Sequence, residues 1–215
     1  MCLRSPSRRA TTGLDRMARR RSISDEQIIE AAKTVFFEKG YSGTTAEIAH
    51  AAGISEGTIF RRFENKRDLF LVALGIDREP SWFKAVDELV GVGDVRENLR
   101  VIMTMLYDFL RGLLPKVMCM FGSPVRAFEL MSVDGQPPIP IRGQLKLLSF
   151  FEAELAAGRI RSGNSVAMAR TVFGTLHSQA FMEVVGFDVV LPIALEVLID
   201  QVIGYVLGPA NCEGV

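Results

Sequence analysis

The sequence predicts an all-α protein of about nine helices. Apolar residues recur at spacings of three and four along most of the 215-residue chain, which is the period of a helix with one buried face. Ser, Thr, Asn or Asp precedes several of these runs and can serve as a helix N-cap. No segment of useful length alternates apolar and polar residues as a half-buried strand would.

Four short helices are predicted in the N-terminal third. Ser24–Gln27 and Thr44–Glu47 are capping boxes that open the first two. Gly53 ends the second helix, and Ser55 and Asn65 are expected to cap the third and fourth. The apolar positions expected to face inward are Ile28, Ala31, Ala32, Val35, Phe36, Ile48, Ala49, Ala52, Ile54, Ile59, Phe63, Leu69, Val72, Ala73 and Ile76.

Longer helices are predicted beyond residue 78. A short helix around Trp82 precedes a long one, which Asp94 caps and which has its apolar stripe as far as Leu113. Pro115 is expected to kink the chain or restart it. The remaining expected elements are an irregular loop at 135–140, helices at 145–155 and 165–185, and a last helix with Pro192 in its first turn.

Charge is distributed unevenly along a chain whose net charge is zero. Residues 1–75 have 13 Lys/Arg against 9 Asp/Glu, whereas residues 76–215 have 12 against 16. A uniformly basic coat for nucleic acid is therefore excluded. Seven arginines and only Asp15 lie within the first 24 residues, so this arm either contacts nucleic acid or is a solvated leader, and Met17 is an alternative start.

Composition limits the other classes of protein. Three scattered cysteines and two histidines provide neither a disulfide framework nor a metal site. The chain has no secretory signal and no apolar run long enough to span a membrane. We therefore expect a cytoplasmic protein without cofactor. No nucleophile–base pairing or phosphate-binding loop indicates an enzyme.

The second and third predicted helices form a helix-turn-helix at residues 44–63. Gly57 lies inside the third helix, where glycine costs about 1 kcal/mol relative to alanine, and it allows close approach to a groove wall. Arg61 and Arg62 can reach guanine edges or phosphates. The residues expected to contact DNA are Thr44, Thr45, Ser55, Glu56, Gly57, Thr58, Phe60, Arg61, Arg62 and Lys66.

The stretch from about Ile28 to Leu74 resembles the DNA-binding domain of the TetR family of bacterial repressors. The resemblance rests on three segments in register: residues 44–49, residues 52–63 and residues 65–69. It implies a homodimer that binds a palindromic operator and is released when a small molecule binds the larger domain. The implied organisation is an arm at 1–22, a DNA-binding domain at 23–77, a ligand-binding and dimerisation domain at 78–210, and a tail at 211–215.

Two residues of the helix-turn-helix need separate interpretation. Phe60 stands where the family usually has tyrosine, and it cannot donate a hydrogen bond to a phosphate. Glu56 either accepts from cytosine or only complements the helix dipole.

In the larger domain, the helix at 165–185 and the last helix are apolar on more than one side, which favours a four-helix dimer interface over a monomeric core. Methionine and phenylalanine adapt to irregular cavities, so a largely apolar ligand is expected. His177 is either a ligand contact or a satisfied core histidine, and a redox role for Cys119 is a weaker idea. The candidate ligand-binding residues are Met103, Leu106, Phe109, Met118, Phe121, Phe128, Phe150, Phe173, His177 and Phe181.

Two functions remain open at this point. One is a ligand-responsive regulator of transcription, most simply a repressor. The other is a structural, nucleoid-associated protein that uses the same fold without a sensing ligand. Operator-like sites throughout the genome would favour the second, and one or two sites beside a promoter would favour the first.

Overall fold

The computed structural model describes residues 23–77, 79–118, 132 and 135–208. Every regular element within these ranges is helical, which confirms the all-α class. The elements are α1 (Asp25–Lys39), the 3-10 helix η1 (Gly40–Ser42), α2 (Thr45–Ala52), α3 (Glu56–Phe60), α4 (Lys66–Ala73), α5 (Ser81–Leu89), α6 (Val95–Met118), α8 (Ile139–Ala156), α9 (Ser165–Val184) and α10 (Leu195–Leu207). The predicted arm at 1–22 and tail at 211–215 lie outside the described residues.

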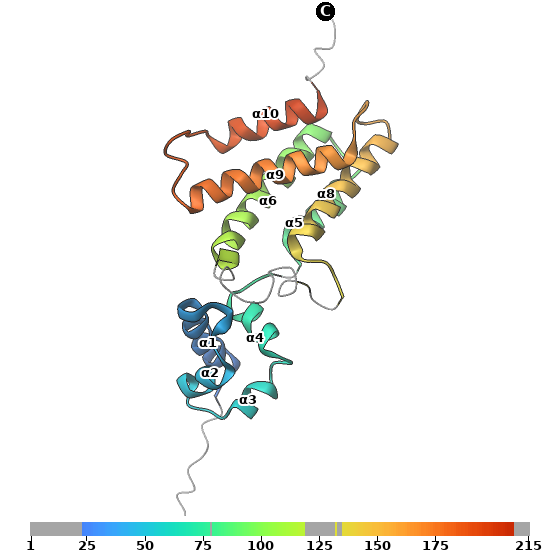
Figure 1. Cartoon of the computed structure of the whole chain (residues 1–215). Coiled ribbons are helices and arrows are strands. Elements are labelled where there is room, and N and C mark those ends of the chain that lie inside the picture. The colour runs from blue at the N-terminus through green and yellow to red at the C-terminus, as the bar shows by residue number, and fades with distance from the viewer. Residues whose placement is uncertain (1–22, 78, 119–131, 133–134, 209–215) are drawn as a thin grey trace, which may run out of the picture.

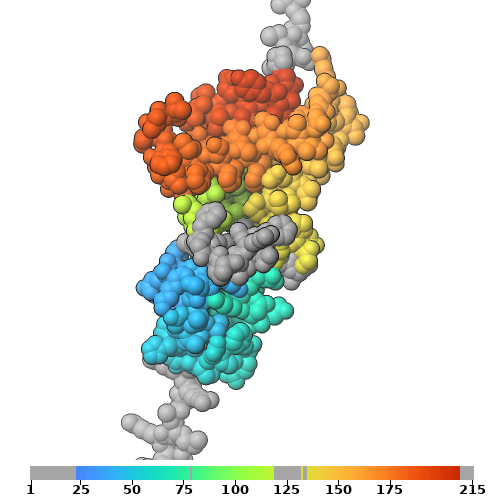
Figure 2. All heavy atoms as spheres, in the orientation of Figure 1, coloured from blue at the N-terminus to red at the C-terminus, as the bar shows by residue number. Residues whose placement is uncertain are grey.

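The helices gather into two bodies (Figure 1). The small body consists of α1 to α4, and the large body of α5, α6, α8, α9 and α10. Within the large body α9 packs on α6 and α8, while α10 covers α6 and α9. Figure 2 shows the small body projecting from the large one, so α3 and α10 lie at opposite ends of the molecule.

Local sequence explains how the first helices begin. Ser24 Oγ accepts from Gln27 N–H at 3.4 Å, and Gln27 Oε1 accepts from Ser24 N–H at 3.1 Å. Thr44 and Glu47 form the same reciprocal pair at the start of α2. Each box satisfies two N–H groups that a helix N-terminus leaves open. Both predicted capping boxes are therefore confirmed.

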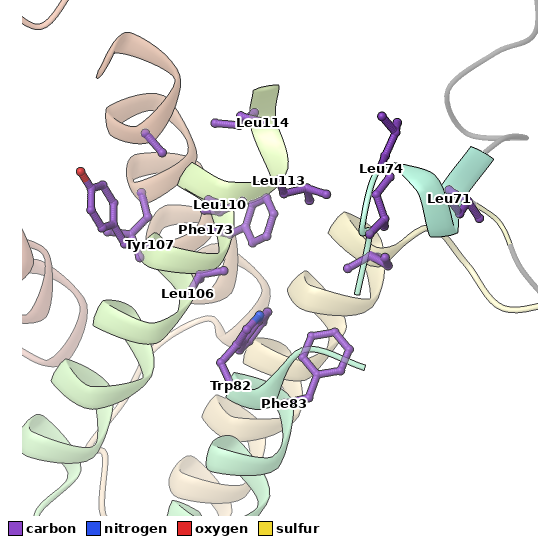
Figure 3. Close-up of a cluster of buried hydrophobic side chains, with 14 of the residues drawn as sticks. Leu71, Leu74, Trp82, Phe83, Leu106, Tyr107, Leu110, Leu113, Leu114 and Phe173 are labelled. Carbon is purple, nitrogen blue, oxygen red and sulfur yellow. The ribbon is translucent and has the colours of Figure 1, made fainter. Parts of the chain in front are cut away.

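The buried face of α4 differs from the prediction. Val72 is 38% exposed, whereas the adjacent Phe70 and Leu71 are buried. Phe70 contacts Phe36 of α1 edge-to-face at 4.8 Å. Leu71 belongs to a cluster with Leu114 of the large body (Figure 3). Because α4 packs against both bodies, a stripe chosen for one buried side placed Val72 inward incorrectly.

Pro115 does not break α6, which continues to Met118. Proline removes one backbone donor, but here it lies in the last turn, where few bonds remain to be lost. The buried Leu113 and Leu114 anchor this turn on the core. Lys116 Nζ also donates to Gly75 O at 2.6 Å, which connects the end of α6 to the residues after α4.

Two predicted boundaries in the C-terminal half are wrong. The loop expected at 135–140 is shorter, because α8 starts at Ile139 with Pro140 in its first turn. Proline is suited to that position because the first turn has no partner for its missing N–H. The last helix starts at Leu195 rather than around Pro192. Burial begins only at Leu195, and Val189 to Leu191 are exposed.

Candidate functional site

The helix-turn-helix is held by its turn and by two buried apolar side chains. Gly53 adopts a left-handed conformation with φ of 68°, and Ile54 N–H donates to Ala49 O at 2.9 Å. Ile48 and Ile59 are buried in the same core as α1. This packing fixes α3 against α2 and directs the opposite face of α3 to solvent.

Most of the predicted DNA-contacting residues lie on that outward surface. Glu56, Gly57, Phe60, Arg61 and Arg62 are exposed, and Thr58 is partly buried. Phe60 is 47% exposed, which is high for an aromatic side chain without a polar atom. A Cβ at Gly57 would meet nothing within 4 Å, so glycine there is not required by packing inside the chain.

Ser55 occupies the N-cap position of α3, but its side chain does not cap the helix. Its hydroxyl instead pairs with the Thr58 hydroxyl at 2.9 Å, and Arg61 Nη2 donates to the same Thr58 oxygen at 3.0 Å. The predicted cap is wrong because the side chains one turn apart bond to each other. The result is a polar row along α3 that holds the Arg61 guanidinium beside the helix.

Thr45 and Glu56 connect the two helices of the motif. Thr45 is buried, and its hydroxyl donates to the Glu56 carboxylate. The sequence analysis interpreted Glu56 as a cytosine acceptor or as a partner of the helix dipole, and this bond belongs to neither interpretation. The two residues are eleven positions apart, so only the packing of α2 on α3 brings them together.

Arg62 and Lys66 lie at the two edges of α3. Arg62 Nη1 forms an ion pair with Asp25 Oδ1 at 2.7 Å, which connects the end of α3 to the start of α1. Lys66 Nζ donates to Tyr41 O at 2.6 Å and lies 4.5 Å from the centre of the Tyr41 ring. Partial burial lowers the pKa of Lys66. An ammonium has three donors, so the single carbonyl leaves others for a phosphate.

The ten candidate ligand-binding residues do not lie in one place. Met103, Leu106, Phe150 and Phe173 are buried in the core, while Met118, His177 and Phe181 are exposed. Phe121 and Phe128 lie outside the described residues. His177 stacks on Phe173 at 6.2 Å, and desolvation lowers its pKa. Because His177 is exposed in the single chain, its interpretation as a core histidine is wrong.

Phe109 is the candidate that lines a cavity. This cavity has a volume of about 270 Å³ and lies between α6 and the segment that leads into α5. The residues that line it are Asp77, Pro80, Ser81, Trp82, Met105, Asp108 and Phe109. The sequence analysis identified the family of apolar candidates but missed both carboxylates and Trp82, because no spacing pattern connects residues 77–82 with α6.

A wider groove of about 610 Å³ runs between α5 and α8. Its charged groups are already paired with each other. Arg142 donates to Glu79, and Lys146 Nζ donates to Asp87 Oδ1 at 2.6 Å. The groove therefore presents neutralised charge at its surface.

The outer face of α9 and α10 exposes large apolar side chains. Phe181 of α9 and Val197 and Tyr205 of α10 are all more than a third exposed. Val189 to Leu191, in the loop between these helices, are about three-quarters exposed or more. Gly174 and Gly204 leave open space beside the two helices. An apolar face of this extent is typical of a surface that another protein surface covers.

Comparison with known proteins places this arrangement in a family. Residues 28–73 match the family described as "Bacterial regulatory proteins, tetR family". A fatty acid metabolism regulator protein of Bacillus subtilis is 28% identical over 154 residues, covering 70% of this chain and 78% of that protein. The chain belongs to the TetR family. The TetR proteins are transcriptional regulators, so this chain is a helix-turn-helix regulator of transcription and not an enzyme.

Two further TetR-type proteins are similar to the chain. The HTH-type transcriptional regulator TtgR of Pseudomonas putida is 48% identical over 44 residues, which are 20% of this chain and 21% of that protein. The structure of the regulator FadR from B. subtilis in complex with stearoyl-CoA has a TM-score of 0.56 at 20% identity. That comparison covers 87% of this chain and 100% of FadR, and it shows a shared fold.

Two other kinds of site were sought in the described part of the chain. None of its helices is long and apolar enough to cross a membrane. No three His, Cys, Asp or Glu side chains in that part lie together as metal ligands would.

Proposed function

We propose that this TetR-family protein is a repressor that binds a palindromic operator as a homodimer and leaves it when a small, largely apolar molecule binds the large body. The observation that carries the proposal is the outward surface of α3. It combines exposed Phe60 and Arg61 with Gly57, which leaves room for close approach. A helix of this kind, presented by a helix-turn-helix, is the element that enters the major groove.

Each exposed residue of α3 has a proposed role. Arg61 is held by Thr58 in a position to contact a guanine edge, and Phe60 packs on sugar or a thymine methyl. Lys66 binds a flanking phosphate through the donors that Tyr41 leaves free. Thr45 acts indirectly, because its hydroxyl holds Glu56 at the start of α3.

The homodimer is supported by the apolar outer face of α9 and α10. Two copies related by a two-fold axis cover the same face on each other. This face lies at the end of the molecule opposite to α3 (Figure 1). A dimer joined there presents two α3 helices, as a palindromic operator requires.

An effector in the large body is supported by the cavity beside Phe109. The similar B. subtilis FadR structure was determined with stearoyl-CoA, which shows that this fold accommodates a small molecule in that protein. The shared fold at 20% identity does not transfer the ligand. The chemistry of the effector must therefore be inferred from the residues of this chain.

Fluorescence polarisation tests the DNA-binding part of the proposal. The labelled probe is the intergenic DNA upstream of the protein's own gene, with excess random DNA as competitor at about physiological salt. We expect saturable binding of two protomers per site. Binding no tighter than to the competitor would contradict a local operator, and many equal sites across the genome would support the structural, nucleoid-associated role.

A single substitution tests the dimer. Val197 is 51% exposed in the single chain, so Val197→Asp leaves the packing of the monomer intact. We expect the wild-type mass by light scattering to be that of two chains and the mass of Val197→Asp to be that of one. Glu196→Gln, beside it on α10, serves as the control. A variant that keeps the wild-type mass would remove this face from the interface.

A further inference from the structure

The cavity beside Phe109 combines an apolar wall with two acidic groups. Trp82, Met105 and Phe109 form the apolar part, and the centres of the two aromatic rings are 6.4 Å apart. Asp77 and Asp108 lie on the same lining. The volume of about 270 Å³ is slightly below the roughly 300–1,000 Å³ of pockets for drug-sized ligands. The cavity therefore suits a compact molecule.

Neither carboxylate is neutralised by a cation. Asp77 accepts from Glu79 N–H at 3.0 Å, and no described Lys, Arg or His forms an ion pair with Asp77 or Asp108. In the neighbouring groove, by contrast, Arg142 and Lys146 each pair with an acidic residue. The cavity thus retains two negative charges beside an apolar wall.

Trp82 supplies a second, independent observation. It is only 1% exposed, and its Nε1 donor finds no hydrogen-bond acceptor among the described residues. Figure 3 shows the ring projecting from α5 into the core, with the nitrogen near its inner end. A buried donor without an acceptor costs free energy, and a bound molecule that brings an acceptor removes this cost.

We infer that the cavity binds a compact aromatic ammonium compound that carries a hydrogen-bond acceptor. The ammonium lies beside Asp77 and Asp108, and the aromatic faces of Trp82 and Phe109 add cation–π attraction. The acceptor receives the Trp82 N–H. A polyanionic ligand such as a coenzyme A thioester is disfavoured, because both unpaired groups of the cavity are carboxylates.

This inference rests on the proposed function in one respect: the bound compound acts as the effector. One wall of the cavity, formed by Asp77, Pro80 and Ser81, is the segment that joins α4 to α5. The opposite wall is α6, whose Lys116 contacts Gly75 at the end of the small body. A ligand between these walls acts on both connections to the DNA-binding helices.

Trp82 allows occupancy to be measured directly, because it is the only tryptophan in the sequence. Its fluorescence is titrated with three probes of almost identical shape. Phenacyltrimethylammonium carries the charge and the carbonyl acceptor, phenyl neopentyl ketone lacks the charge, and phenethyltrimethylammonium lacks the acceptor. We expect saturable quenching by the first probe, with binding about fivefold to tenfold weaker for each of the others.

The variant Asp108→Asn removes one charge without changing shape. Glu152→Gln, on the exposed side of α8 and away from the cavity, is the matched control. Circular dichroism establishes that both variants are folded. We expect Asp108→Asn to weaken phenacyltrimethylammonium severalfold, to leave the ketone unchanged, and Glu152→Gln to change neither. Equal affinities for all three probes, or no change of fluorescence at millimolar probe, would overturn the inference.

The DNA measurement is kept separate from the binding measurement. Polarisation of the operator complex is recorded with and without phenacyltrimethylammonium, and we expect release only with the charged, carbonyl-bearing probe. Quenching of Trp82 without release would uphold the site and contradict its role as effector site. Failure to bind any operator would contradict the proposed function while the fluorescence titration still decides the ligand chemistry.

Discussion

The small and large bodies use their charged side chains in different ways. In the large body the Glu154 carboxylate is fully buried, accepts from Gly91 N–H at 2.8 Å and is paired with Arg159. In the small body Arg61 and Lys66 lie near the surface and bond to uncharged oxygens, the Thr58 hydroxyl and the Tyr41 carbonyl.

The difference separates stability from recognition. A buried charge must be fully paired inside the fold, because burial without partners costs several kcal/mol. A surface cation held by a neutral oxygen keeps its charge uncompensated and retains donors for another partner. We therefore expect substitutions at the Glu154 cluster to affect folding and those around α3 to affect DNA binding.

Replacing Glu154 with alanine should have the largest effect. It leaves the Arg159 guanidinium and the Gly91 N–H without their acceptor, at a cost of about 3 kcal/mol in unfolding free energy. Urea unfolding, followed through Trp82 fluorescence at fixed protein concentration, measures it. Glu152→Ala, exposed on the same helix, should change the unfolding free energy by less than about 0.5 kcal/mol. A Glu154→Ala midpoint equal to the control's would contradict a structural role for this cluster.

Arg61→Ala should reduce operator binding by about 1–3 kcal/mol while leaving stability almost unchanged. The loss should be greater on the operator than on random DNA, because a base-edge contact is lost. Polarisation titrations with the two DNAs measure the difference. Equal losses on both would make Arg61 a contact of the sugar–phosphate backbone instead.

Lys66→Ala should weaken binding to every DNA sequence by about 1 kcal/mol and lower the salt slope by about 1. The physical reason is the loss of one phosphate neutralisation. Titrations at several salt concentrations measure the slope, and Lys84→Ala on α5 of the large body is the control. An unchanged slope in Lys66→Ala would remove this residue from the phosphate contacts.

The smallest effect is expected at the second capping box. The hydrogen bond from Lys39, followed by the bonds from Thr44, lowers the pKa of Glu47 to about 2. Since this pKa is below that of an unfolded chain, its contribution to stability is complete above the ordinary carboxyl pKa and is lost as pH falls toward 2.

Lys39→Met removes the largest of these causes, so the pKa of Glu47 should rise toward its ordinary value. Carboxyl chemical shifts followed by NMR between neutral and acidic pH measure it. Lys33→Met, whose partner Glu30 is on the same helix, should leave the titration of Glu47 unchanged. An unaltered Glu47 titration in Lys39→Met would assign the low pKa to the cap alone.

The sequence predicted those parts of the fold that depend on neighbours within one helical turn. Both capping boxes, the turn at Gly53 and the burial of Ile48 and Ile59 follow from short spacings. The predictions that were wrong involve contacts between elements. Val72 lies outside because α4 is packed from two directions, and Ser55 bonds to Thr58 rather than capping α3.

The candidate sites divide in the same way. The surface of α3 was predictable because one short motif carries all of its residues. The cavity was not, because Asp77 and Trp82 meet Asp108 and Phe109 only when the segment before α5 lies against α6. Among the ten candidate ligand residues, composition selected apolar side chains, and most of those that the structure describes are core or exposed helix surface.

By itself, the sequence determined the helical class, the position of the helix-turn-helix and the family to which the chain belongs. These depend on periodicity, caps and a glycine turn, all of which are local. Only the tertiary structure decided which carboxylates remain unpaired, which bury their charge and which side of α4 faces solvent. The physical reason is that pairing and desolvation depend on distances between residues far apart in the chain, and no local pattern fixes these distances.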